Sequence, residues 1–372
     1  AFARLGPLRR LNIIVRNGLR TADVLAARYL HTTPHNLPVL LLFLTNRCNL
    51  RCRMCGVCEL ERESGAADEL DAEQWKAVLR SARRLNTTLV SISGGEPLLR
   101  DDLFDILGEA RDLGLAVHLC TNGLLLTEAN IARLRETGVG VVSVSLESAD
   151  RAIHEHMRGK NTFERTVAGI ERLHAGAPEI RIGINVVITP ANLAGLPDMI
   201  PFAESLGAAQ IKFAPIHTNL LHRDKPLDSY GGLLFEEKHL TELRAGLARL
   251  AEACARSRLL TTSSAFFEGI PDLYQHPRRF RCYAGYAVCA VGPSGEVGAC
   301  CDVQSPLSVR DRPLEDIWRS PEYAAVRRQV RQCTRACWDT TNAELSLRLR
   351  PTSMLRTLIN TWRDVGFYYG DG

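Results

Sequence analysis

The sequence TNRCNLRCRMC, at residues 45–55, places Cys48, Cys52 and Cys55 in one short loop. Three thiolates at this C-x3-C-x2-C spacing are close enough to hold one inorganic cluster, and they leave one iron of a 4Fe–4S cube without a protein ligand. An open iron binds a small molecule, so the motif predicts chemistry rather than electron storage alone. Zinc sites usually arrange their ligands as two separated pairs, which one compact triplet matches poorly.

A second motif, GGEP at residues 94–97, follows an apolar run of the kind that forms a buried strand. In this order, the cysteine triplet and GGEP resemble the signature of the radical S-adenosylmethionine (SAM) enzymes. The resemblance covers residues 39–215. It implies that SAM binds the open iron of a 4Fe–4S cluster through its amino and carboxylate groups. It also implies that SAM is cleaved to a 5′-deoxyadenosyl radical, which takes a hydrogen atom from a substrate carbon.

Strand-like apolar runs alternate with helical patterns along this part of the chain, as in a parallel sheet that is buried on both faces. The expected strands are residues 39–45, 88–93, 115–121, 141–147, 181–188 and 210–215, and the helices between them are residues 71–85, 101–113, 127–136, 163–175 and 193–206. Repeated βα units form a barrel or an open sheet. The resemblance selects an α/β fold with a partial (β/α)6 TIM-like barrel, whose site lies at the C-terminal ends of the strands.

Local signals place several helix ends. Asp71 is a predicted N-cap, supported by Glu73 and Gln74 in the first turn. Gly114, Gly138 and Gly207 stand where helix C-caps are expected.

The motif residues suggest how SAM is held. Gly94 and Gly95 allow the backbone to approach a ligand closely, and the resemblance implies that Glu96 faces the SAM ammonium group. In the fourth expected strand, Ser143, Ser145 and Glu147 alternate with apolar residues and point to one face, which is expected to be the barrel interior. The resemblance makes Ser145 a contact for the SAM carboxylate or ribose, while a solvated polar face is the competing interpretation.

Two more residues are implicated by resemblance. Arg158, in the segment HMRGKN, matches an arginine of the peptide-modifying branch that contacts the SAM carboxylate, and a guanidinium suits that group. Asn122, in TNG, is a candidate contact for the ribose or the substrate, as is Asn185. His154 is interpreted as structural. Met54 stands where the family often has an aromatic residue near the adenine.

A later set of cysteines, Cys282, Cys300, Cys333 and Cys337, includes a G-x4-C motif ending at Cys300. The set resembles the C-terminal SPASM module, or its shortened twitch form, with a fully ligated auxiliary 4Fe–4S cluster. A four-thiolate zinc site is the alternative. Cys289 and Cys301 are spare cysteines, either of which could replace a neighbouring ligand, and Asp302, Asp339 and Tyr283 are candidate bases for a substrate proton. In the first motif, Cys58 forms a further C-x2-C with Cys55 and is interpreted as a non-ligand or an accessory thiol.

The 372 residues suffice for one large domain and an appendage. We expect a basic amphipathic helical segment at 1–36, a radical SAM core at 37–232, a linker helix with the auxiliary module at 233–342, and an amphipathic tail at 343–372. We interpret the terminal helices as packing on their own protein. Contact with an anionic membrane surface is an alternative for both of them, and a targeting peptide is another for the N-terminus.

Composition narrows the partners and the compartment. The net charge of +4 does not indicate a nucleic-acid partner. Twelve cysteines at metal-ligand spacing in a long chain favour a reducing, cytoplasmic compartment over disulfides. No secretory signal is visible, and the apolar run at 37–44 is too short to span a bilayer.

The leading hypothesis is therefore a radical SAM oxidoreductase with two 4Fe–4S clusters, reduced by an external donor of the flavodoxin or ferredoxin type. The auxiliary cluster would conduct an electron away from the substrate, giving an oxidation, a crosslink or a carbon–carbon bond. A peptide, a sugar and a lipid all remain open as substrates. The alternative is a non-catalytic protein that uses iron–sulfur clusters or zinc structurally.

Overall fold

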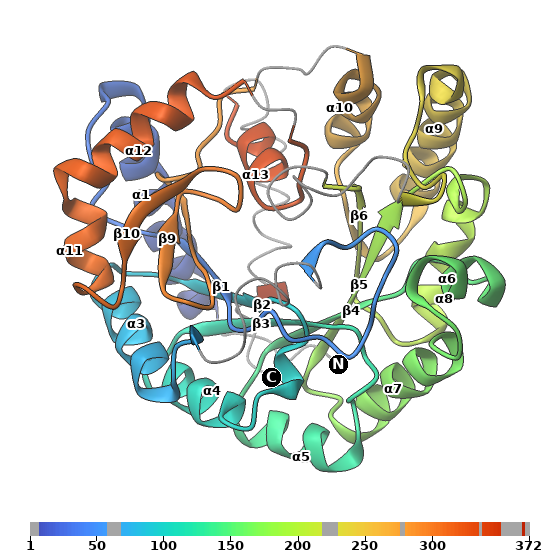
Figure 1. The fold of residues 1–372 in the computed structure, drawn as a ribbon, viewed down its shortest axis with the longest axis horizontal. Coiled ribbons are helices and arrows are strands. Elements are labelled where there is room, and N and C mark those ends of the chain that lie inside the picture. The colour runs from blue at the N-terminus through green and yellow to red at the C-terminus, as the bar shows by residue number, and fades with distance from the viewer. Residues whose placement is uncertain are drawn as a thin grey trace.

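The computed structural model describes residues 7–57, 68–217, 230–275, 280–334, 337–350 and 367–368, and their side chains except those of residues 7–14 and 274–275. Strands β1 to β6 are parallel and form a curved sheet whose outer face is covered by helices (Figure 1). This arrangement confirms the partial barrel that the family resemblance implies.

The strands occur in the order β10-β9-β8-β1-β2-β3-β4-β5-β6-β7 across one sheet. Their bounds are β1 (Val39–Phe43), β2 (Leu89–Ser93), β3 (Ala116–Thr121), β4 (Val141–Ser145), β5 (Arg181–Ile188), β6 (Gln210–Pro215), β7 (Leu260–Thr261), β8 (Val288–Val291), β9 (Glu296–Gly298) and β10 (Gln304–Ser308). Pairing is parallel from β8 to β7, whereas β8, β9 and β10 pair with one another in antiparallel fashion.

The helices alternate with the strands through the barrel and then continue into the C-terminal module. Their bounds are α1 (Pro7–Leu30), α3 (Ala72–Arg84), η2 (Pro97–Leu99), α4 (Leu103–Asp112), α5 (Glu128–Glu136), α6 (Arg151–Arg158), α7 (Phe163–Gly176), η3 (Leu193–Asp198), α8 (Met199–Ser205), η6 (Glu237–His239), α9 (Leu240–Arg256), α10 (Ser264–Gln275), α11 (Leu314–Arg319), α12 (Pro321–Gln332) and α13 (Asn342–Arg348). Figure 1 shows α3, α4, α5 and α7 following one another around the outside of the strands.

The helix signals in the sequence are confirmed where they rest on local chemistry. Asp71 forms a complete capping box with Gln74, which satisfies backbone groups that the first turn leaves without a helical partner. Gly114, Gly138 and Gly207 adopt φ values of 67°, 67° and 75°, the left-handed conformation that ends a helix.

Three predicted helices need correction or fall outside the described residues. The segment 193–206 begins as the 3-10 helix η3 and becomes α-helical only at α8, because Pro197 has no N–H to donate at the junction. The linker helix expected at the start of the 233–342 segment begins only at Leu240, as α9, after a separate 3-10 turn. Most of the amphipathic tail expected at 343–372 lies outside the described residues.

The C-terminal module joins the barrel through its backbone and through buried side chains. Strand β8 extends the sheet by pairing with β1, from Val39–Val288 to Leu42–Val291. The Trp318 indole N–H donates to the Pro34 carbonyl at 3.0 Å. The buried Arg327 guanidinium lies 4.4 Å from the Trp318 ring and donates to the Gly285 carbonyl at 2.6 Å. The auxiliary module is thus held in a fixed position at the edge of the barrel.

Replacing Asp71 with alanine should lower the free energy of unfolding by about 1 kcal/mol, because the first turn of α3 loses its capping side chain. The midpoint of thermal unfolding measures this change. Asp112→Ala is the control, because its surface ion pair with Arg111 contributes little. Equal midpoints for the two variants would contradict the capping argument.

Candidate functional site

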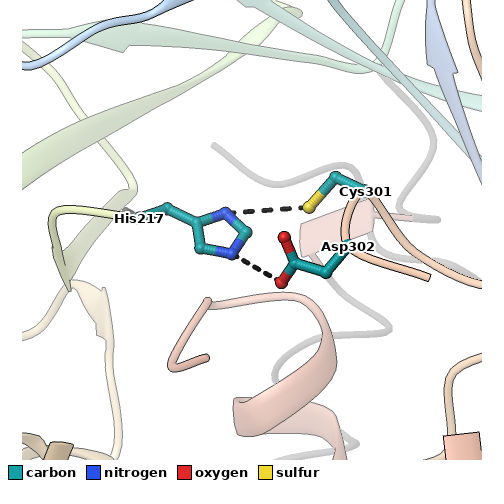
Figure 2. Close-up of side chains that lie close together, drawn as sticks. All are labelled: His217, Cys301 and Asp302. Carbon is teal, nitrogen blue, oxygen red and sulfur yellow. Dashed lines mark hydrogen bonds and ion pairs between the residues drawn. The ribbon is translucent and has the colours of Figure 1, made fainter. Parts of the chain in front are cut away.

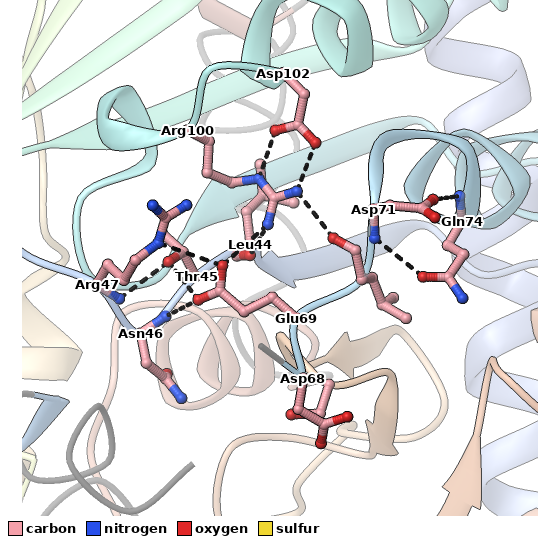
Figure 3. Close-up of polar contacts among 12 residues, drawn as sticks. Leu44, Thr45, Asn46, Arg47, Asp68, Glu69, Asp71, Gln74, Arg100 and Asp102 are labelled. Carbon is pink, nitrogen blue, oxygen red and sulfur yellow. Dashed lines mark hydrogen bonds and ion pairs between the residues drawn. The ribbon is translucent and has the colours of Figure 1, made fainter. Parts of the chain in front are cut away.

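The loop that carries the first cysteines is anchored before it reaches Cys48. Glu69, which is buried, accepts hydrogen bonds from the Thr45 hydroxyl at 2.5 Å and from the Asn46 N–H at 3.1 Å. Arg100, also buried, donates to the Leu44 carbonyl at 2.9 Å and forms an ion pair with Glu69 at 3.3 Å. Figure 3 shows this network where the chain leaves β1. The network fixes the direction in which the cysteine loop begins.

Gly94 and Gly95 bring the second motif against the same loop. The Gly95 N–H donates to the Thr45 carbonyl at 2.6 Å, and the Glu96 N–H donates to the Arg47 carbonyl at 2.8 Å. A Cβ atom at Gly95 would lie 2.1 Å from the Arg47 carbonyl oxygen, and one at Gly94 would lie 2.4 Å from that of Thr45. The sequence predicts that the backbone of these glycines approaches a ligand closely. In the structure the same backbone also lies against the start of the cysteine loop.

Glu96 is completely buried, and its carboxylate binds groups of the protein. One oxygen accepts from the Leu98 N–H at 3.1 Å and the Thr121 hydroxyl at 2.9 Å, and the other accepts from the Asn122 N–H at 2.8 Å. Burial raises the pKa of Glu96, while these hydrogen bonds and the charge of Arg158 oppose the rise. The carboxylate thus joins the end of β3 to the GGEP turn.

The Asn122 side chain links the end of β3 to the cysteine loop. Its amide nitrogen donates to the Asn49 side-chain oxygen at 2.7 Å, and its amide oxygen accepts from the Leu124 N–H at 3.0 Å. Both ends of the amide therefore contact the protein, and the predicted ribose or substrate contact stays a prediction.

Glu147 and Arg158 form a buried ion pair beside the cysteine loop. The Arg158 Nε donates to one Glu147 oxygen at 2.6 Å, and the Val187 N–H donates to the other at 2.6 Å. Burial alone would lower the pKa of Arg158, but the charges of Glu147, Cys52 and Cys55 outweigh it and raise that pKa. A guanidinium close to two cluster-type cysteines provides a fixed positive charge for an anionic group.

Helix α6 places Arg158 there by contacting the loop directly. The Arg53 N–H donates to the Met157 carbonyl at 2.9 Å, and the Cys52 thiol lies 3.9 Å from the Arg158 carbonyl. Met54 is buried in a small apolar cluster with Met157. His154 is buried, accepts the Glu147 N–H, and has its pKa lowered to about 3 by burial. It is structural, as the sequence indicates.

The barrel encloses a cavity of about 380 Å³ whose wall includes Ser145, Arg158 and Asn185. Sequence reasoning missed two polar residues in the same wall, His118 and Lys212. A histidine in β3 and a lysine in β6 stand inside otherwise apolar strand runs, and this interruption is the signal that could have identified them.

Tyr368 lines the same cavity from the C-terminal segment. Its hydroxyl accepts a hydrogen bond from Lys212 at 2.8 Å, and its ring packs edge-on against His118 with centroids 5.8 Å apart. Burial, and then the charge of Lys212, lower the pKa of His118 to about 3, so its imidazole is neutral. The cavity therefore has a positively charged, hydrogen-bonding inner end.

The four later cysteines have the surroundings of metal thiolates. The Cys282 sulfur accepts the Ala284 N–H at 3.4 Å, and the Cys300 sulfur accepts the N–H groups of Asp302 and Val303. Burial raises the pKa of Cys282 to about 12, and the charge of Cys333 adds to this rise. Backbone N–H groups directed at sulfur stabilise iron–sulfur clusters.

Cys337 belongs to the same neighbourhood. Burial raises its pKa, and the charges of Asp339, Cys282 and Cys300 raise it further. Thiols that disfavour one another's ionisation in a buried site are neutralised by a bound cation or cluster. The residues present thus fit an auxiliary cluster, while the assignment of each ligand stays a prediction.

The two spare cysteines near this set have different surroundings. Cys289 is buried in β8, where its sulfur accepts a hydrogen bond from the Tyr323 hydroxyl of α12 at 3.3 Å and donates to the Gly298 carbonyl at 3.4 Å. Cys301 faces His217, outside the core that contains Cys300. Cys58 lies outside the described residues.

The fold and this arrangement of cysteines, glycines and a buried arginine define a SAM-dependent iron–sulfur enzyme. A model of the radical SAM superfamily matches residues 42–200, and a model of the SPASM iron–sulfur cluster-binding domain matches residues 282–339. The chain is 33% identical over 297 residues to a PqqA peptide cyclase of Gluconobacter oxydans, which covers 77% of this chain and 78% of the relative. The chain belongs to the radical SAM superfamily and carries a SPASM domain.

Other comparisons agree with this membership. An AdoMet-dependent heme synthase of Oleidesulfovibrio alaskensis is 28% identical over 295 residues, covering 75% of this chain and 74% of the relative. The structure of Streptococcus suis SuiB bound to precursor peptide SuiA has the same fold, with a TM-score of 0.64 at 19% identity over 82% of this chain and 70% of SuiB. The chain is therefore an enzyme that uses SAM, a 4Fe–4S cluster and an auxiliary iron–sulfur cluster, and the non-catalytic alternative is set aside.

A helix that crosses a membrane must be long and apolar. Within the described ranges, no helix combines the length and the apolar character needed to cross a bilayer.

Replacing Gly95 with alanine should prevent formation of the cluster at the cysteine triplet, because the added Cβ collides with the Arg47 carbonyl. After anaerobic reconstitution, iron should fall from about eight to about four per chain. Gly108→Ala is the matched control, because a Cβ there meets nothing within 4 Å. Full iron content in Gly95→Ala would show that the glycine is not needed for the loop contact.

Proposed function

We propose that this chain oxidises or crosslinks a side chain of a peptide by radical SAM chemistry. The observation that carries the proposal is the 33% identity to a PqqA peptide cyclase over 77% of this chain. The cavity of about 380 Å³ supports it, because that volume accommodates one inserted side chain while the rest of a peptide stays outside. A sugar or a lipid is the less favoured substrate.

We further propose that Cys48, Cys52 and Cys55 hold the catalytic cluster at the mouth of the barrel. When bound, the reduced cluster and SAM supply a 5′-deoxyadenosyl radical that takes a hydrogen atom from the substrate. Arg158, fixed by Glu147, provides positive charge for the SAM carboxylate. Ser145 provides a hydroxyl in the cavity wall.

In this proposal the GGEP segment supports the SAM site. Gly94, Gly95 and Glu96 hold the edge of the SAM site in place through backbone contacts with the cysteine loop. Asn122 supports the same loop through Asn49.

The auxiliary cluster is proposed to bind Cys282, Cys300, Cys333 and Cys337. Four protein ligands leave no iron open to a substrate, so this cluster is suited to carrying electrons. Backbone N–H groups that donate to the Cys282 and Cys300 sulfurs would stabilise it. When bound, this cluster would accept the one electron that a substrate radical loses together with a proton to a base, which would complete a two-electron oxidation. A flavodoxin- or ferredoxin-type donor is the proposed source of the electron that starts each turnover.

We propose the same division of the chain as above: an N-terminal helical segment at 1–36, the radical SAM core at 37–232, the linker helix and auxiliary module at 233–342, and a C-terminal tail at 343–372. The exposed side chains of Val15 and Leu19 on α1, next to Arg16 and Arg20, keep contact of this helix with an anionic membrane as a subordinate proposal.

Replacing Cys48, Cys52 and Cys55 together with alanine should remove about four of about eight irons per chain. Formation of 5′-deoxyadenosine from SAM and dithionite should cease, because no open iron remains to bind SAM. Chromatographic measurement of 5′-deoxyadenosine tests this. Cys254→Ala, in α9, is the control. A triplet variant that still cleaves SAM would disprove the assignment.

Replacing Cys333 and Cys337 with alanine should leave SAM cleavage intact but stop the oxidation of the product. The auxiliary cluster should be lost, leaving about four irons per chain. Iron content and 5′-deoxyadenosine are measured together on the same sample. Loss of SAM cleavage in this variant, with the catalytic cluster still present, would contradict the electron-conduit role.

The substrate class is tested with the short peptides encoded closest to the gene. Each peptide is incubated anaerobically with the reconstituted enzyme, SAM and dithionite. The expected product has lost the mass of two hydrogen atoms, as measured by mass spectrometry, and forms together with 5′-deoxyadenosine. Modification of a sugar or lipid, with every such peptide unchanged, would exclude the peptide proposal.

A further inference from the structure

Three ligand-type side chains meet where the barrel faces the auxiliary module. His217 follows β6, and Cys301 and Asp302 lie in the turn between β9 and β10 (Figure 2). The His217 Nε2 lies 2.9 Å from an Asp302 oxygen, and its Nδ1 lies 3.7 Å from the Cys301 sulfur. One ring nitrogen, one carboxylate oxygen and the thiol sulfur all lie within 4.8 Å of one another.

We propose that His217, Cys301 and Asp302 bind one divalent transition-metal ion of borderline softness, with Zn²⁺ as the best fit, at a site separate from both iron–sulfur clusters. A nitrogen, a sulfur and an oxygen ligand are the set that zinc combines in proteins. Two ligand atoms of a tetrahedral zinc ion lie about 3.3–3.7 Å apart, given bond lengths of about 2.0–2.3 Å. A single ion binds only one nitrogen of the His217 ring, and with one ligand atom from each residue the three atoms lie within 4.8 Å of one another, so small side-chain rotations are needed to reach tetrahedral distances.

The charge around this triad favours a cation. Asp302 is buried at 5% exposure, and a buried carboxylate needs a positive partner. The carboxylate of Asp339 contributes further negative charge near His217. A bound dication would compensate the negative charge that these groups bring together.

Adjacent cysteines are directed to different partners, so the proposed zinc ligands differ from the proposed cluster ligands, while Cys301 lies within electrostatic range of Cys300 and Cys337. The Cys300 sulfur is buried in the main core and receives backbone N–H groups from Asp302 and Val303. The Cys301 sulfur instead faces the imidazole of His217, which belongs to the barrel. The proposed ion therefore joins the barrel to the module, whereas the proposed cluster lies within the module.

Three protein ligands leave one position of a tetrahedral ion open, as in catalytic rather than structural zinc sites. That position takes water or an electron-pair donor such as a carboxylate, an imidazole or a thiolate. His217 lies two residues beyond Pro215, the last residue of β6, so the open position is at the end of the barrel where the cysteine loop lies. The inference depends on this geometry and not on the proposed peptide substrate.

The test uses the full chain, reconstituted anaerobically with iron and sulfide and then dialysed against a small excess of Zn²⁺. Elemental analysis should find one zinc in addition to about eight irons per chain. X-ray absorption at the zinc edge should show one sulfur at about 2.3 Å and nitrogen or oxygen ligands at about 2.0–2.2 Å. His217→Gln, Cys301→Ser and Asp302→Asn should each lose the zinc and keep the iron.

The controls are His35→Ala, an exposed histidine, and Cys254→Ala, a cysteine in α9, and both should keep the zinc. Three results would overturn the proposal. The wild-type protein binds no zinc under these conditions, or its zinc has only sulfur ligands, or Cys301→Ser loses about half of the iron. The second result places the ion at the auxiliary cysteines, and the third makes Cys301 a cluster ligand. None of these results bears on SAM cleavage, which is measured separately.

Discussion

Backbone contact between the GGEP segment and the cysteine loop is the constraint on which the rest of the site depends. Two N–H groups, of Gly95 and Glu96, reach the carbonyls of Thr45 and Arg47. Any side chain at Gly95 would occupy the same space as the Arg47 carbonyl. The three cysteines are thereby placed by the end of β2 as well as by the end of β1, so their common loop is held at both sides.

Buried carboxylates organise the remainder of the site from within. Glu96 ties β2 to β3, and Glu147 ties β4 to β5 through the Val187 N–H while it holds Arg158. Burying such groups is unfavourable unless each charge has partners, and removing one member of a buried pair costs about 3–5 kcal/mol. Their hydrogen-bonding partners therefore fix the positions of Glu96 and Glu147, and Glu147 in turn fixes the Arg158 guanidinium beside the cysteine loop.

The auxiliary module is part of the barrel's own sheet. Strand β8, which starts the hairpin that precedes Cys300, pairs directly with β1, the strand that leads to Cys48. This pairing of β1 with β8 fixes the position of the module's first strand relative to the barrel. The contact between His217 and Asp302 closes the same junction from the opposite side of the barrel mouth.

The sequence by itself determined the features that depend on local spacing. The cysteine triplet, GGEP, the alternating strands and caps such as Asp71 predict the family, the barrel and most element bounds, because each acts over a few residues. Only the tertiary structure decided which distant groups meet. Asn122 pairs with Asn49, Lys212 with Tyr368, and His217 with Asp302. Such contacts depend on how curved strands and their loops converge, and sequence spacing carries no information about that convergence.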